Sequence, residues 1–123
     1  MGQDKAKIAD TSADALARAC AETMWAADNA SRHMGMKLEH VAAGTATMSM
    51  RVQDFMTNGH DICHGGLITT LADSAFAYAC NSYDELTVAS GFTVDLLAPG
   101  RLGAVLSARC HEVSKAGRTG VYD

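Results

Sequence analysis

The stretch "HGGLITTLADSAFAYAC", residues 64–80, holds a single charged residue, Asp73, among apolar and small residues. Two glycines, Gly65 and Gly66, open a run rich in Ala and Leu that predicts a buried helix from Leu67 to about Tyr83. Glycine lets a ligand approach the backbone closely, and the first N–H groups of a helix have no intrahelical acceptor. They also lie at the positive end of the helix dipole. The pattern therefore indicates a site for an oxyanion at the start of this helix.

Asp73 has two interpretations, because a carboxylate in a buried helix is costly unless it is paired or hydrogen-bonded. In the first it is structural, either bonded to the hydroxyl of Thr69, Thr70 or Ser74 or facing solvent at a gap in the sheet. In the second it is catalytic. Seven residues separate it from Gly66, about 10 Å along a helix axis, so one chain cannot bring both to one carbonyl group. A catalytic Asp73 therefore predicts a two-fold dimer with antiparallel helices side by side.

Other potential site residues give weaker signals. His64 could orient a substrate oxygen, or it could bond to the backbone of a loop. Cys63 and His64 have no second ligand cluster at zinc-like spacing, so we expect no metal. The sequence contains neither a GxSxG elbow nor a P-loop. The four cysteines are scattered, and no basic-then-apolar signal segment opens the chain, which predicts reduced thiols in the cytoplasm.

Length and charge limit the class of protein. A chain of 123 residues with 48% hydrophobic content predicts one domain over residues 1–123. Its longest apolar run is too short to cross a bilayer, and a net charge of −4 argues against nucleic-acid binding. Residues 101–123 nevertheless hold four basic and two acidic residues. These are either ordinary solvated charges on an outer strand or a local anion site.

The remaining elements predict an antiparallel sheet curled around the central helix. An amphipathic helix begins after Thr11 or Ser12 and ends before Gly35, and one strand runs from His40 to Val52. Asn58 and Gly59 mark a turn. The stretches "ELTVASGFTVDLLA" and "GAVLSARCHEVSKAG" predict two strands joined by the turn "PGRLG", and "RTGVYD" begins another.

Three motifs carry a resemblance to a known family. The segments "NGHDICHGGLITTLADSAFAYACNS", "VASGFTVDLLAPGRLG" and "AGRTGVYD" resemble the hotdog-fold acyl-CoA thioesterases, and among them the phenylacetate-degradation thioesterase (PaaI) family. The resemblance begins at "AADNASRHMGM" and covers nearly the whole chain. It implies an α+β hotdog fold, an antiparallel β-sheet wrapped around a long central helix. It also implies homodimers with shared active sites, commonly paired as dimers of dimers. Family members continue after "TGVYD" with one more strand, so we expect a C-terminal strand to be missing from this chain.

The resemblance also implies roles for individual residues. The catalytic carboxylate falls on Asp73, the amide that polarises the thioester on Gly65, the accompanying histidine on His64, and the loop asparagine on Asn58. The basic C-terminal region resembles the part that meets the phosphates or the adenine end of coenzyme A, and its candidate residues are Arg101, Lys115, Gly117 and Arg118.

The implied reaction is hydrolysis of aryl- or phenylacetyl-CoA thioesters, in phenylacetate or other aromatic degradation. Coenzyme A is part of the substrate, so no separate cofactor is expected. Asp73 would either activate water or attack the thioester directly. The alternatives are a hotdog acyl-CoA hydratase or dehydratase, and a non-catalytic domain that binds acyl-CoA as a sensor.

Overall fold

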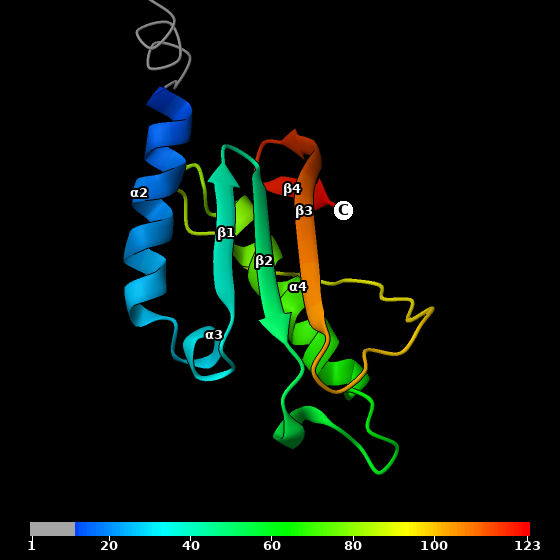
Figure 1. The fold of residues 1–123 in the computed structure, drawn as a ribbon. Coiled ribbons are helices and arrows are strands. Elements are labelled where there is room, and N and C mark those ends of the chain that lie inside the picture. Colours follow the sequence, from blue (N-terminus) through cyan, green and yellow to red (C-terminus); the bar gives the residue numbers. More distant parts are fainter. Residues whose placement is uncertain (1–11) are drawn as a thin grey trace, which may run out of the picture.

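The sheet and the helix that it surrounds define the architecture. The computed structural model describes residues 12–123. In chain order the elements are α2 (Ser12–Ala27), α3 (Asn29–His33), β1 (Lys37–Ala42), β2 (Thr45–Arg51), the 3-10 helix η1 (Asp54–Met56), α4 (Gly65–Cys80), β3 (Val105–Ala116) and β4 (Thr119–Tyr122). The strands form one antiparallel sheet in the order β1-β2-β3-β4. The α4 helix packs behind β2 and β3, and α2 lies beside β1 (Figure 1). The predicted α+β fold is confirmed.

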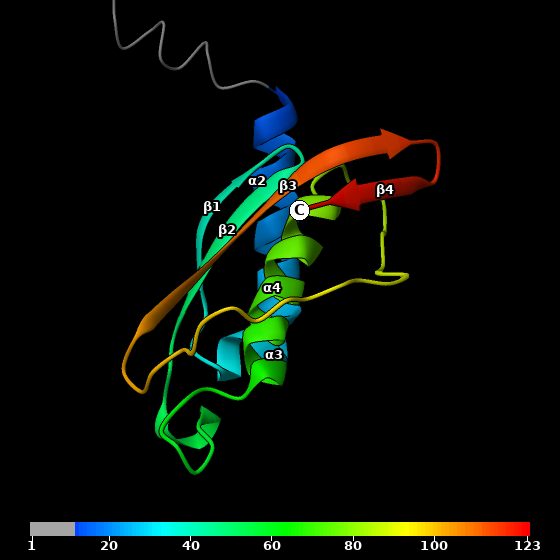
Figure 2. The ribbon, with the colours of Figure 1, turned by 90° about the vertical axis from the view of Figure 1, so that its right-hand side faces the viewer.

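The core lies between α4 and the concave side of the sheet (Figure 2). Met48 and Met50 alternate along β2 with side chains that are 0% and 1% exposed, as the period of two in a strand requires. From α4, Leu71, Ala75 and Tyr78 fill the space opposite them. Methionine is unbranched and adaptable, which suits the irregular gap between a twisted sheet and a helix. The helix is buried on this side only and exposes residues such as Ala72 and Asp73 on the other, so the predicted buried helix is only half covered in a single chain.

The predicted first helix is interrupted at Asp28, whereas a continuous pattern up to Gly35 was expected. Asp28 Oδ1 accepts a hydrogen bond from Ser31 N at 3.1 Å and caps α3, as aspartate does at helix starts. Its other oxygen accepts from the Tyr78 hydroxyl at 3.0 Å, and Ser31 Oγ lies 2.8 Å from Ser74 Oγ. The interruption thus attaches α3 to α4. The alternative cap residue Thr11 lies outside the described residues.

The strand predicted from His40 to Val52 is wrong, because the structure has a hairpin there. The paired residues Ala42 and Thr45 close a two-residue turn in which Gly44 has a φ of 74°. Glycine adopts this left-handed conformation without steric cost, so it suits the second position of the turn. The N–H of Gly44 donates to Ser82 Oγ at 2.8 Å, so the turn is also held by the residues that follow α4.

The strand predicted over "ELTVASGFTVDLLA" is also absent. Asn81 holds the backbone N–H and C=O of Thr87 at 2.9 and 3.0 Å, but no hydrogen bond among the described residues joins the backbone of residues 88–98. The segment is extended and leaves the sheet (Figure 1). A strand needs a neighbouring strand to satisfy its backbone, and the described chain supplies none here. The turn predicted at "PGRLG" is present, with Ala104 N donating to Arg101 O at 2.9 Å.

Candidate active site

The start of α4 presents backbone donors. His64 precedes the helix, and its carbonyl accepts hydrogen bonds from Leu67 N at 3.0 Å and Ile68 N at 3.2 Å. No described residue accepts a hydrogen bond from the N–H of Gly65 or Gly66. Both groups lie at the positive end of a 16-residue helix. They can therefore stabilise negative charge on an oxygen, as the sequence predicts.

Asn58 shapes the loop that leads to this helix. Its Oδ1 accepts from His60 N at 2.9 Å, and its backbone N–H donates to Ile62 O at 2.9 Å. The loop closes where Thr57 and Cys63 form an antiparallel bridge. The asparagine side chain accordingly orders the loop that ends at His64, and the turn predicted at Asn58 and Gly59 is confirmed.

A second turn holds the same loop from the other side. Cys63 N donates to Gly100 O at 2.7 Å, Leu102 N donates to Asp61 O at 3.1 Å, and Ile62 forms a bridge with Arg101. Burial raises the pKa of the Cys63 thiol, so this residue acts here as a neutral packing group. These bonds place Arg101 beside the loop that carries Asn58 and His64.

Asp73 lies on the exposed face of α4, and the structure assigns other partners to the neighbouring hydroxyls. Thr69 and Thr70 donate to the carbonyls of Gly65 and Gly66 at 2.9 and 2.8 Å, and Ser74 bonds to Ser31. Asp73 has no hydrogen bond or ion pair with a described residue. The interpretation in which a hydroxyl holds Asp73 is therefore wrong, and in a single chain the carboxylate faces solvent.

The two halves of the predicted site do not meet within one chain. Eight residues separate Gly65 from Asp73 in the same helix, which is about 12 Å along its axis. Asn58, His64, Gly65 and Arg101 are brought together at the helix start. Asp73 lies two turns further along the helix, on the uncovered face.

The candidate residues for binding coenzyme A lie at two places far apart in one chain. Lys115, Gly117 and Arg118 lie at the turn between β3 and β4, whereas Arg101 lies before the other end of β3. A 12-residue strand is about 40 Å long, so one chain does not bring these two groups together. Lys115 Nζ lies 3.9 Å from Glu85 Oε1 and 5.1 Å from the centre of the Tyr83 ring. Arg118 is exposed.

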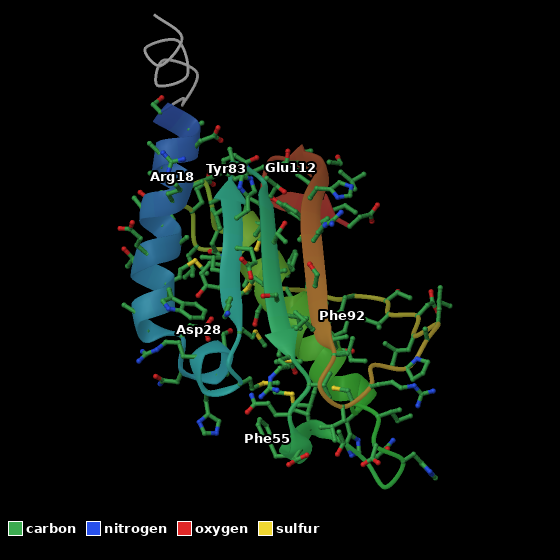
Figure 3. The ribbon with its side chains drawn as sticks, viewed as in Figure 1. Arg18, Asp28, Phe55, Tyr83, Phe92 and Glu112 are labelled. Atoms are coloured by element: carbon green, nitrogen blue, oxygen red, sulfur yellow. The ribbon has the colours of Figure 1, made fainter. Side chains whose placement is uncertain are left out.

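One polar cluster has no signal in the sequence. Tyr83, in the turn after α4, and Tyr122, in β4, both donate to Glu112 Oε1, at 2.8 and 3.2 Å. Figure 3 labels Tyr83 and Glu112 at the same end of the sheet. Burial, and then the hydrogen bond to Glu112, raise the pKa of Tyr83 to about 12. The cluster joins the turn after α4 to β3 and β4, beyond the end of α4 that is opposite His64. Only the tertiary contacts reveal it, because 29 positions separate Tyr83 from Glu112.

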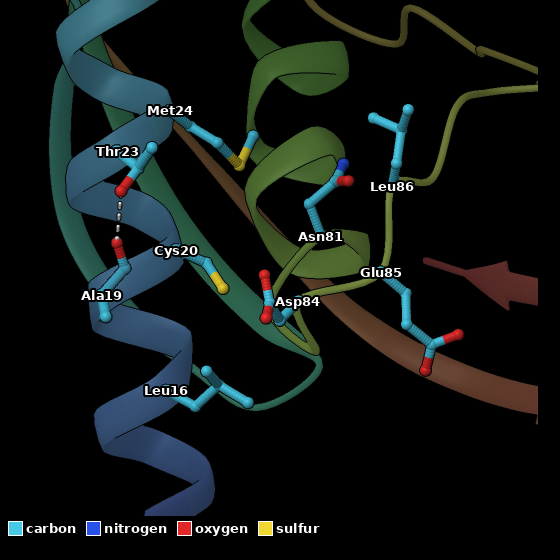
Figure 4. Close-up of a pocket in the computed structure, with 9 residues that line it drawn as sticks. All are labelled: Leu16, Ala19, Cys20, Thr23, Met24, Asn81, Asp84, Glu85 and Leu86. Atoms are coloured by element: carbon cyan, nitrogen blue, oxygen red, sulfur yellow. Dashed lines mark hydrogen bonds between the residues drawn. The ribbon is translucent and has the colours of Figure 1, made fainter.

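A shallow cleft of about 410 Å³ lies between α2 and the turn after α4 (Figure 4). Apolar side chains such as Leu16 and Leu86 line it together with the carboxylates of Asp84 and Glu85. It contains none of the predicted site residues. Within residues 12–123, no group of three or more His, Cys, Asp or Glu could hold a metal ion. None of the helices in that range is long and apolar enough to span a membrane.

Comparison with known proteins identifies the class. The model of the thioesterase superfamily matches residues 60–123, which include the helix start, Asp73 and the basic C-terminal segment. The chain belongs to the thioesterase superfamily, and its sheet wrapped around a central helix is the hotdog fold of these enzymes. The family predicted from the sequence is confirmed.

Individual relatives are similar to this chain in sequence and in structure. The chain is 42% identical over 103 residues to the acyl-coenzyme A thioesterase PaaI of Escherichia coli (strain K12), covering 84% of this chain and 74% of that protein. The structure of the E. coli PaaI protein from the phenylacetic acid degradation operon superposes with a TM-score of 0.89 at 40% identity, covering 90% of this chain and 80% of that one. A hypothetical thioesterase protein from Streptococcus pneumoniae TIGR4, solved with coenzyme A, gives a TM-score of 0.67 at 26% identity over 72% of this chain and 69% of its own.

Proposed function

We propose that the protein hydrolyses acyl-coenzyme A thioesters to the free acid and coenzyme A, with phenylacetyl-CoA or a related aryl-CoA as substrate. The observation that carries this proposal is the start of α4, where the N–H groups of Gly65 and Gly66 have no acceptor among the described residues. The acyl-coenzyme A thioesterase and the phenylacetic acid degradation operon named for the E. coli relatives support the substrate class.

In the proposed reaction the thioester carbonyl oxygen accepts a hydrogen bond from Gly65 N–H, and the helix dipole favours the charge that develops on it. Asp73 of a second copy acts on the carbonyl carbon by one of two routes. As a base it takes a proton from water, whose oxygen bonds to the carbon as the C–S bond breaks and the thiolate takes up a proton. As a nucleophile its oxygen bonds to the carbon and displaces the thiolate, and water then hydrolyses the mixed anhydride.

The proposed site therefore belongs to a homodimer. The 12 Å between Gly65 and Asp73 supports this arrangement, because two antiparallel copies of α4 would place each glycine near the other chain's carboxylate. The extended segment after α4 supports it as well, since Leu86, Val88 and Leu97 on this segment are 96%, 79% and 94% exposed. Large apolar side chains exposed together on an extended segment favour association with another chain.

The finer assignments are also proposals. The basic residues at the β3–β4 turn, Arg118 foremost, would bind the anionic nucleotide of coenzyme A. A dimer of dimers follows from the family resemblance and would be tested by the mass of the particle in solution. We propose a cytoplasmic location because all four cysteines are free thiols.

Release of thiol from a panel of acyl-CoAs tests the activity. Asp73→Asn should keep the fold and lower turnover at least about a hundredfold, because the amide has nearly the same size but cannot act as a base or anionic nucleophile. Asp84→Asn is the matched control, since Asp84 is exposed beyond the other end of α4 and its φ of 60° is one that asparagine tolerates. Near-normal turnover by folded Asp73→Asn would exclude Asp73 from the mechanism. Binding of acyl-CoA without thiol release would indicate a sensor.

A further inference from the structure

Leu96 lies directly over the first residue of α4. A Cβ atom placed on Gly65 would be 2.5 Å from Leu96 Cδ1, which is closer than two such carbon atoms can approach. The side chain of Leu96 is therefore in contact with the glycine whose N–H is the proposed oxyanion donor. Its neighbour Leu97 is 94% exposed, whereas Leu96 is 53% exposed. Of these two leucines, only Leu96 is directed toward the helix start.

The chain just after Leu96 is attached to the loop that precedes α4. Only four positions separate Leu96 from Gly100, whose carbonyl accepts from Cys63 N at 2.7 Å. Gly100 is itself buried, and a Cβ atom placed on it would crowd Leu106 Cδ1 at 3.3 Å. The bridge between Ile62 and Arg101 extends the same attachment. The segment that carries Leu96 is thus joined to the loop that carries His64 and Gly65, and the contact between Leu96 and Gly65 follows from that attachment.

We propose that Leu96 is a specificity-determining residue that packs against the acyl group beside the thioester carbonyl. This inference rests on the proposed function. A carbonyl oxygen bound to Gly65 N–H lies about 3 Å from the nitrogen, so the carbons on either side of the thioester lie within van der Waals reach of a side chain over the same glycine. The pantetheine side is polar and common to all acyl-CoAs. A branched apolar side chain matches the acyl side, where substrates differ.

The test compares kcat/KM for acetyl-, hexanoyl-, benzoyl- and phenylacetyl-CoA. Leu96→Ala removes three carbon atoms from the side chain proposed to contact the acyl group. It should raise kcat/KM for the bulky acyl groups relative to acetyl-CoA by about tenfold, because each methylene in an apolar pocket can change selectivity at least that much. Leu96→Phe should change the ratio in the opposite direction. Leu16→Ala is the matched control, because Leu16 is a 41% exposed leucine on α2 in the cleft that contains none of the predicted site residues, and it should leave the ratio unchanged.

A substitution at Gly65 would displace the Leu96 side chain without altering Leu96 itself. Gly65→Ala keeps the N–H group, but its Cβ must displace Leu96 Cδ1. It should therefore change the acyl ratio when Leu96 is present and have no further effect on the ratio in the Leu96→Ala protein, where the clashing atom is gone. Since the Leu96 side chain is half exposed, its truncation leaves no buried cavity and the variants should fold.

Two results would overturn the assignment alone. If the unmodified protein releases thiol and Leu96→Ala changes kcat/KM equally for all four substrates, Leu96 contacts the shared coenzyme A portion. If it leaves all four unchanged, Leu96 does not touch the substrate. Release of no thiol from any acyl-CoA by the unmodified protein would instead refute the proposed function, and the assignment with it.

Discussion

Mixing two inactive variants, Gly65→Pro and Asp73→Asn, should restore activity. The structure makes Gly65→Pro a suitable perturbation. His64 has φ −56° and ψ 135°, the extended conformation that a residue before proline requires, and Gly65 is the first helical position, where proline is tolerated. Proline removes the proposed donor and displaces Leu96 Cδ1, which belongs to the same chain's half of the site.

The expected recovery follows from the geometry of α4. Because about 12 Å separates Gly65 from Asp73, each proposed site combines the glycine of one chain with the aspartate of the other. In a mixed dimer one site receives both defects and the other receives neither. Random reassortment makes about half of the dimers mixed, so activity per chain should reach roughly a quarter of that of the unmodified protein.

The assay is thiol release from phenylacetyl-CoA after the two variants have exchanged subunits. Circular dichroism and the mass in solution first establish that each variant folds and associates. Exchange itself is confirmed by mass spectrometry on an isotopically labelled partner. A mixture that has exchanged subunits and remains inactive would mean that a single chain builds each site, and the argument from the spacing of Gly65 and Asp73 would be refuted.

Three further outcomes are expected. Gly44→Ala should lower the free energy of unfolding, measured in urea, by about 2–4 kcal/mol, because the φ of 74° is left-handed and the new Cβ would lie 2.7 Å from the Tyr83 hydroxyl that bonds Glu112. In a Tyr83→Phe background the loss should shrink to about 1–2 kcal/mol, and an equal loss in both would disprove the clash. The melting temperature should fall as the pH rises from about 10 to 12, because the unfolded tyrosine loses its proton near 10 while burial and Glu112 raise the pKa of Tyr83 in the folded protein to about 12. Tyr83→Phe should reduce that fall, and an unchanged pH profile would count against it. Arg118→Ala should raise KM for acyl-CoA more than it lowers kcat, less so in high salt, and a similar loss with acyl-pantetheine substrates would rule out contact with the nucleotide.

The central helix and the strand β3 could be predicted because their patterns are local. The helix predicted from Leu67 to about Tyr83 lies within three residues of α4 (Gly65–Cys80) at each end, and "GAVLSARCHEVSKAG" covers the 12 residues of β3. The prediction of a single strand over His40–Val52 failed because the chain reverses direction at Gly44. Gly44 lies in a stretch that otherwise suits a strand, and the turn became evident only from its left-handed φ and its bond to Ser82.

The segment from Glu85 to Ala98 shows the limit of pattern alone. Its alternation of β-branched and apolar residues is typical of a strand, but strand formation requires a partner for the backbone groups. Among the described residues none is available. Without a partner strand, apolar side chains of this segment stay exposed, as Leu86, Val88 and Leu97 do.

The sequence by itself determined which groups lie at the start of α4 and how far Asp73 is from them. The order His64, Gly65 and Gly66, followed by one carboxylate two turns later, predicts an oxyanion site and a shared catalytic group, because helix geometry converts residue spacing directly into distance. The tertiary structure decided what surrounds that chemistry. It brought Arg101 and Leu96 to the helix start through the bond between Cys63 and Gly100, and it placed Arg118 at the far end of β3. These placements depend on how loops distant in the sequence pair with one another, and no local period in the chain encodes that pairing.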